Sequence, residues 1–164
     1  MRHADRPTAE EQIHVAATPE QVWPLVTDIT LITRTSEELV HAHWSDPDGG
    51  PAVGRTFVGT NRNEYFGEWQ TTSTVTECEP PAVFAWCVGD LDEPNTSWRF
   101  TVRPDGSGCV VSQWVKLGYG PSGLHLAIRS MPDKEERIVA RRMKEFATGM
   151  RANLEEIKRL AESG

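Results

Sequence analysis

The chain has 164 residues, of which 38% are hydrophobic and 25% are charged, a composition typical of a folded domain rather than a disordered segment. Its length fits one domain with a substantial core. Seventeen basic and twenty-four acidic residues give a net charge of −7, which would repel nucleic acid phosphates and anionic membrane surfaces. The charge therefore argues against a nucleic acid or a membrane as partner.

The sequence also carries signals about compartment and redox state. Its first residues lack the apolar segment of a secretory signal, and no apolar run is long enough to span a bilayer, so we expect a cytoplasmic protein. The three cysteines, Cys78, Cys87 and Cys109, are odd in number and lack metal-ligand spacing. We therefore expect free thiols.

The polar, charged residues 1–11 predict a flexible leader, and residues 12–163 a single domain. Within that domain, Ile13 and Val15 alternate with polar residues and predict a short first strand over residues 12–17.

A helix is expected directly after this strand. The run Thr18-Pro19-Glu20-Gln21 combines a Thr cap, a Pro at the first helical position and a Gln that closes a capping box. This pattern predicts a helix from Pro19 to about Asp28. Because Pro24 lies beyond the first turn and cannot donate a backbone hydrogen bond, the helix should be short or kinked.

The segment from Glu37 to Leu117 has the punctuation of consecutive β-hairpins. Turn sequences rich in Pro, Asp, Asn and Gly separate six runs rich in Val, Thr, Phe and Trp. Short connections of this kind join antiparallel neighbours, so with the first strand the sheet has seven strands. The six runs are residues 39–45, 55–65, 69–77, 83–88, 96–103 and 109–118.

The C-terminal part predicts a long helix. Residues 119–130 contain Gly and Pro and are interpreted as an irregular connection. The glycines from Gly118 to Gly123 are interpreted as a flexible gate over the entrance of the cavity. Pro132 opens a helix whose apolar face is centred on Phe146. The predicted fold class is α+β: a seven-stranded antiparallel sheet wrapped around a long C-terminal helix, with one or two short helices after the first strand.

Both the sheet and the long helix have polar residues where a solid core would have apolar ones. Thr71 and Ser73 share a strand face with Trp69 and Val75, and Ser112 shares one with Trp114. On the helix, Arg142, Gly149 and Asn153 interrupt the apolar face. This pattern favours an internal cavity between sheet and helix. The alternative is that Thr is simply a good strand former and that Arg extends to solvent.

The order of elements, together with Ala17-Thr-Pro-Glu-Gln-Val-Trp-Pro-Leu-Val-Thr-Asp28, resembles the START-like, helix-grip superfamily often labelled SRPBCC. Trp69-Gln-Thr-Thr-Ser-Thr-Val-Thr-Glu-Cys-Glu-Pro80, Phe84-Ala-Trp86, Trp98-Arg-Phe100 and Asn153-Leu-Glu-Glu-Ile-Lys158 are similar to its bacterial polyketide cyclase/dehydrase-like group. The resemblance covers residues 12–162. It implies the helix-grip fold, but carries no catalytic signature common to all members.

The resemblance implies three kinds of function. Members include ring-closing and dehydrating enzymes, carriers of lipids or hormones, and proteins of antibiotic self-resistance. A further alternative for this chain is an interaction module that resembles the heat-shock ATPase activators of this fold and uses its outer surface. The thirteen Arg against four Lys residues fit a bacterium of high GC content and secondary metabolism. We expect binding of a hydrophobic, oxygen-bearing small molecule, with cofactor-free cyclisation or dehydration or with carriage and sequestration alone.

Two residues are candidates for catalysis. Arg142 would place a guanidinium in an apolar stripe, where it could polarise a ligand carbonyl or instead form an ion pair with Glu135 or with a carboxylate of a strand. His125 could act as general acid or base at the mouth of the cavity, or could be exposed without a role. Neither a cofactor nor a metal site is expected.

Two other motifs do not indicate a functional site. His41 and His43 share a strand face but lack a third ligand at suitable spacing, so we interpret them as surface residues. Gly118-Tyr-Gly-Pro-Ser-Gly123 matches a dinucleotide-binding pattern but follows an antiparallel strand, which argues against such a site.

The expected ligand-binding residues are the aromatic, polar and helix side chains assigned to the cavity wall, and the chain is expected to be a monomer or a homodimer. The set is Phe57, Asn61, Trp69, Thr71, Ser73, Trp86, Trp98, Phe100, Ser112, Trp114, Met143, Phe146, Gly149, Met150 and Asn153.

Overall fold

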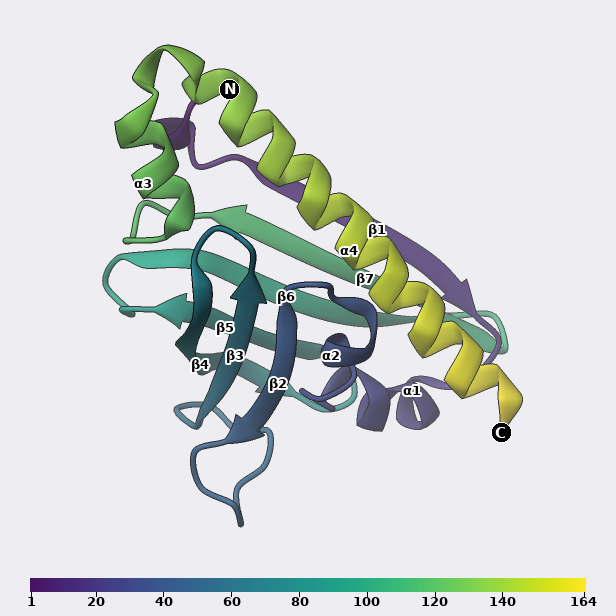
Figure 1. The fold of residues 1–164 in the computed structure, drawn as a ribbon. Helices are drawn as coiled ribbons and strands as arrows, with labels where there is room; N and C mark the ends of the chain where they lie inside the picture. The colour runs from purple at the N-terminus through teal and green to yellow at the C-terminus, as the bar shows by residue number, and fades with distance from the viewer.

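A single seven-stranded antiparallel sheet forms the centre of the protein in a computed structural model that describes residues 1–164 (Figure 1). The strand order is β1-β7-β6-β5-β4-β3-β2, so β2 to β7 form a meander and β1 pairs with the last strand. The strands are β1 (Thr8–Val15), β2 (Leu39–Trp44), β3 (Thr56–Asn63), β4 (Gly67–Glu79), β5 (Val83–Gly89), β6 (Pro94–Asp105) and β7 (Gly108–Leu117).

Four α-helices accompany the sheet. They are α1 (Pro19–Val26), α2 (Ile32–Thr35), α3 (Gly123–Ser130) and α4 (Glu135–Ser163), with short 3₁₀ turns η1 (His3–Asp5) and η2 (Pro132–Lys134). The predicted fold class is confirmed. None of the helices combines the length and apolar character that a bilayer crossing requires.

The capping box predicted for the first helix is present. Gln21 N donates to Thr18 Oγ1 over 3.2 Å, and Thr18 N donates to Gln21 Oε1 over 2.9 Å. The helix ends at Val26, two residues before the expected Asp28, and contains Pro24. The short length predicted from Pro24 is therefore confirmed.

The N-terminal segment is more ordered than the sequence predicts. Strand β1 begins at Thr8, so residues 8–11 belong to the sheet instead of a leader. Before it, His3 is buried, and its Nε2 lies 2.8 Å from Gly118 O. The His3 backbone N also donates to Glu135 Oε2 over 3.0 Å. These contacts attach the start of the chain to the start of α4, and polar composition alone did not indicate them.

The connection between β7 and α4 also differs from the expectation. Residues 123–130 form helix α3, with Ser122 Oγ accepting from His125 N over 3.3 Å. A side chain at Gly118 would collide with the Pro94 carbonyl, and one at Gly120 would come within 2.8 Å of Asn95 N. These glycines permit close backbone packing, so the predicted flexible gate is not what they form.

Helix α4 lies along β1 and β7, while β2 and β3 lie at the other end of the sheet (Figure 1). The apolar core has two parts. The larger cluster joins α1 and the C-terminal half of α4 to the sheet and contains Phe84, Phe100, Leu154 and Ile157. The smaller one joins the N-terminal half of α4 to β7. The sheet is therefore densely covered near α1 and less so towards the start of α4.

Candidate functional site

The residue pairing across the sheet defines its inner face, the one that packs against α4. Phe57 pairs with Ser73, Val75 with Trp86, and Trp86 with Trp98, and Phe57, Val75 and Trp86 belong to the larger core cluster. Because residues opposite each other project to the same side, the inner face can be followed from strand to strand. Of the predicted site residues, Phe57, Asn61, Trp69, Thr71, Ser73, Trp86, Trp98 and Phe100 lie on it.

Two predicted residues on β7 lie on the opposite, outer face. Cys109, Val111 and Val115 are fully buried and belong to the two core clusters, so the even-numbered Ser112 and Trp114 point away from α4. The Arg99 guanidinium lies 4.6 Å from the centre of the Trp114 ring. Assigning Ser112 and Trp114 to the cavity wall was wrong. Both faces of β7 carry apolar residues, so the sequence pattern did not show which face of the strand points towards α4.

The same register brings a residue to the inner face that was not predicted. Gln113 is only 1% exposed, and its Oε1 accepts a hydrogen bond from Asn153 Nδ2 of α4 over 3.1 Å. The hydroxyl of Thr35, at the end of α2, shares its proton between Asn153 Oδ1 and Ile32 O. A polar chain of three side chains therefore links α2, α4 and β7. The one signal in the sequence was the apolar alternation at odd positions from Cys109 to Leu117, which only Gln113 interrupts.

The predicted apolar residues of α4 pack on the sheet. Met143, Phe146 and Met150 are buried in the smaller cluster. The Phe146 ring stands nearly perpendicular to that of Trp98, with centroids 5.2 Å apart, and Trp98 stacks on Trp86. These rings form an apolar aromatic cluster between α4 and the sheet.

Arg142 lies on the flank of this helix face rather than within it. Its side chain is 32% exposed and forms ion pairs with Glu38 over 3.4 Å and with Glu145 over 3.0 Å. The guanidinium also lies 4.7 Å from the centre of the Phe146 ring. The anticipated partner Glu135 is instead bound by Arg2. Glu38 and Glu145 therefore neutralise the guanidinium charge of Arg142, which the sequence analysis placed within the apolar face of the helix.

His125 lies in α3 instead of a loop, within a cluster of rings. Tyr119 stacks on His3 with centroids 4.7 Å apart, and His125 meets both rings edge-on. His125 Nδ1 is buried without a hydrogen-bond partner, and no other side-chain nitrogen or oxygen shares that state. The structure does not bring His125 and Arg142 into contact through any hydrogen bond.

Open space lies beside Gly149, because a Cβ there would meet no atom within 4 Å. Gly149 lies on the same flank of α4 as Arg142 and Asn153, whose side chains reach Glu38 and Thr35. We call the opening between these two contacts the Gly149 gap. It separates α4 from the segment that joins α2 to β2.

Two buried inner-face side chains carry polar atoms without a hydrogen-bond partner. Ser73 is 4% exposed and Gln113 1%, and neither Ser73 Oγ nor Gln113 Nε2 has a partner within the protein. Unlike His125 Nδ1, these two atoms are not completely enclosed.

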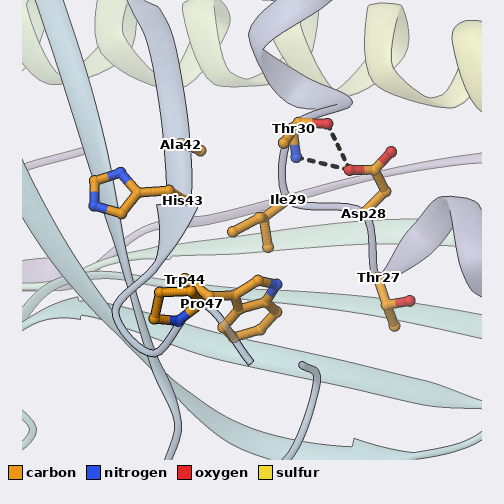
Figure 2. A pocket seen from close by; sticks show the side chains of 8 residues that line it. All are labelled: Thr27, Asp28, Ile29, Thr30, Ala42, His43, Trp44 and Pro47. Carbon is orange, nitrogen blue, oxygen red and sulfur yellow. Dashed lines mark hydrogen bonds between the residues drawn. The ribbon is translucent and has the colours of Figure 1, made fainter. Parts of the chain in front are cut away.

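A separate surface hollow of about 460 Å³ lies between the α1–α2 turn and the end of β2. Figure 2 shows Ile29 between the Trp44 ring and a turn in which Thr30 N and Oγ1 donate to Asp28 Oδ1. Ile29 and Ala42 belong to the larger core cluster, so packed side chains close its floor. This hollow is a depression on the core rather than the predicted internal cavity.

The other residues that could take part in chemistry are two histidines on β2 and the three cysteines. His41 and His43 are exposed, with ring centroids 5.6 Å apart. All three cysteines are free, and burial raises the pKa of each thiol. A thiol with a raised pKa is a weak nucleophile at neutral pH.

Comparison with known families identifies the group to which this architecture belongs. Residues 6–162 match the family described as "Polyketide cyclase / dehydrase and lipid transport". The chain belongs to this family. The match begins inside the expected leader, in agreement with the early start of β1. A search of curated proteins finds no match.

Solved structures of family-like proteins share the fold. A Polyketide_cyc-like protein, Cgl2372 from Corynebacterium glutamicum, is 32% identical, with a TM-score of 0.68 over 94% of this chain and 91% of that one. The di-domain ARO/CYC protein StfQ of the steffimycin pathway is 14% identical, with a TM-score of 0.72. Its relative BexL, of the BE-7585A pathway, is 16% identical, with a TM-score of 0.66.

The coverage of these two proteins is partial. The match spans 98% of this chain and 54% of StfQ, and 95% of this chain and 50% of BexL. The chain therefore corresponds to about half of each di-domain protein. At these identities the similarity concerns the fold alone.

Proposed function

We propose that the protein binds a hydrophobic, oxygen-bearing small molecule between α4 and the inner face of the sheet. The observation that carries the proposal is the pair of unpartnered polar atoms, Ser73 Oγ and Gln113 Nε2, buried on a largely apolar face of the sheet. Ligand sites combine such walls with a few polar groups that fix orientation. The Gly149 gap supplies free space next to α4.

The wall chemistry favours a flat molecule. Trp98 on β6 packs against Phe146 of α4 and stacks with its cross-strand partner Trp86, so the region between helix and sheet is rich in aromatic rings. Aromatic rings contribute large apolar area with little loss of side-chain entropy. Asn61 and Thr71, whose side chains are 3.4 Å apart, add polar groups on β3 and β4. A polycyclic or folded polyketide matches this combination.

Catalysis is the finer part of the proposal and needs no cofactor. In an aldol closure, a base removes a proton between two ketones, the enolate carbon attacks a third carbonyl, and the alkoxide takes up a proton. Loss of water from that product forms the double bond. His125 would move the protons, and Arg142 would stabilise the enolate through guanidinium N–H groups that Glu38 and Glu145 do not occupy.

A carrier or sequestering protein is the second candidate. The observation in its favour is the pairing of Arg142 with two carboxylates, which reduces its ability to stabilise an anion. Such a protein would bind the same molecule at the same place without turnover.

The test begins with native mass spectrometry of the purified protein and a thermal-shift screen of polycyclic and linear polyketides. A ligand that binds the folded state alone raises the apparent melting temperature as its concentration increases. Thr71→Leu on the inner face should lower ligand affinity about tenfold or more by occupying space. Thr72→Leu, one residue along the same strand and exposed on the outer face, is the matched control and should leave affinity unchanged.

The outcomes separate the candidates. Binding that Thr71→Leu weakens and Thr72→Leu does not supports the internal site. Turnover that Arg142→Ala or His125→Ala abolishes while binding persists supports the enzyme, whereas saturable binding without turnover supports the carrier. A broad panel without any bound ligand would refute the proposal and favour an interaction module.

A further inference from the structure

The Asn153–Gln113 pair has a direction, because Asn153 Nδ2 donates to Gln113 Oε1. The single Thr35 hydroxyl proton is shared between Asn153 Oδ1 and Ile32 O. An amide that accepts with its oxygen presents its nitrogen at the other end. Gln113 Nε2 is therefore the terminal donor, and no protein atom accepts from it.

The polar chain of Thr35, Asn153 and Gln113 also fixes where that donor lies. Asn153 and Gln113 are 5% and 1% exposed, and their hydrogen bond is buried between α4 and β7. Thr35 holds the Asn153 amide from α2, on the side of the Gly149 gap. With both amides held, the Gln113 nitrogen has one orientation, and a donor so preorganised loses little entropy when it binds an acceptor.

The surroundings of the donor are apolar. Phe100 lies directly opposite Gln113 on β6 and is 2% exposed, and Trp98, one inner-face position along that strand, pairs with Val115. A donor in such surroundings has a strong preference for a partner, because leaving it without one is unfavourable. Because no protein atom accepts a hydrogen bond from Gln113 Nε2, the partner can be part of a ligand.

We propose that Gln113 Nε2 donates a hydrogen bond to a carbonyl oxygen of the bound molecule and that Thr35 and Asn153 are positioning residues for this contact. The inference rests on the proposed function and deepens it: the ligand class is a flat, apolar molecule with a ketone or quinone oxygen. The chain thereby selects carbonyl compounds over hydrocarbons of the same shape.

The test compares two probes of matched shape and charge, 9,10-anthraquinone-2-sulfonate and anthracene-2-sulfonate, by isothermal titration calorimetry. They differ in two carbonyl oxygens. The wild-type protein should bind the quinone about tenfold more tightly, a difference of about 1.4 kcal/mol. Gln113→Met removes the donor at similar side-chain length and should abolish the preference while leaving the affinity for the anthracene unchanged. Gln70→Met, on the exposed face of β4, is the control and should keep the preference.

A second pair of variants keeps the proposal testable if Gln113→Met fails to fold. Thr35→Val removes the first donor of the chain without touching Gln113 and should reduce the quinone preference, whereas Thr35→Ser keeps the hydroxyl and should preserve it. A purely structural role for Thr35 would change both affinities together and leave their ratio unaltered.

Each outcome decides a different statement. Equal binding of both probes by the wild-type protein would overturn the role of Gln113 and leave the proposed function standing. A Gln113→Met variant that loses both affinities equally would also overturn it, since the residue would then act through packing. Binding of neither probe would count against the proposed function in this ligand class and against the inference together.

Discussion

Replacing Gly149 by Ala tests whether the gap beside α4 is open. Gly in the interior of a helix is less favourable than Ala by about 0.8–1.0 kcal/mol, because its backbone loses more freedom on folding. A Cβ at Gly149 would meet no atom within 4 Å, so no steric cost offsets this gain. Gly149→Ala should therefore stabilise the protein by about 1 kcal/mol.

The expected change is measurable by calorimetry or urea unfolding. For a domain of this length, 1 kcal/mol corresponds to about 2–4 °C in Tm. Ala140→Gly, at an exposed position of the same helix, gives the intrinsic helix contribution and should lower stability by a similar amount. A Gly149→Ala variant that melts below the wild type would show that the position is occupied, and would refute the open gap.

A larger side chain at the same position extends the test to binding. Gly149→Leu should fill the gap and weaken ligand affinity, whereas Gly149→Ala should leave affinity nearly unchanged. Equal affinities for all three proteins would mean that the ligand does not approach this part of α4.

Three further changes test other parts of the structure. His3→Ala should lower the free energy of unfolding by about 1–3 kcal/mol, because it removes a buried ring and its contact with Gly118; urea unfolding unchanged by the substitution would contradict this. Hydrogen bonds from Ala16 N and then from Lys158 lower the pKa of Glu162, so its contribution is present above about pH 4.3 and is lost as the pH falls through the folded-state value. The stability difference between wild type and Glu162→Gln should accordingly shrink below about pH 4, and a constant difference would argue against this linkage. Cys109 is fully buried with a raised pKa, and a thiol reagent should label it only on unfolding.

The agreement between sequence and structure is greatest where local chemistry decides the outcome. Thr18 and Gln21 define the start of α1 through their own side chains, and Pro24 shortens the helix within one turn. Turn residues set the ends of β2 to β7, because each hairpin is closed by residues adjacent in sequence. Such signals do not depend on distant partners.

The sequence predictions differ from the structure where contacts between residues far apart in the chain determine the local conformation. Polar residues near the N-terminus join β1 because β7 offers a free edge, and His3 is buried because Gly118 and Glu135 lie beside it. Gly118 was interpreted as part of a flexible gate, but its lack of a side chain allows it to pack closely against the Pro94 backbone.

The candidate site shows the same division. Alternation on β3 and β4 gave the correct inner residues, such as Asn61 and Thr71, because polar and apolar positions differ clearly there. On β7 both faces have hydrophobic residues, so the pattern could not choose between Ser112 and Gln113. The helical wheel placed Arg142 on the apolar face of α4. In the structure its guanidinium instead pairs with Glu38, more than a hundred residues away in the chain, and stays partly exposed.

The fold class, the number of strands and their order along the chain follow from periodicity, turn chemistry and capping, which are local features of the sequence, and the family follows from the resemblance of its motifs. Which polar side chains face inward, and which of their atoms remain free, became visible in the tertiary structure alone. That choice depends on the packing of α2, α4 and β7 against one another, and residues far apart in the chain make those contacts.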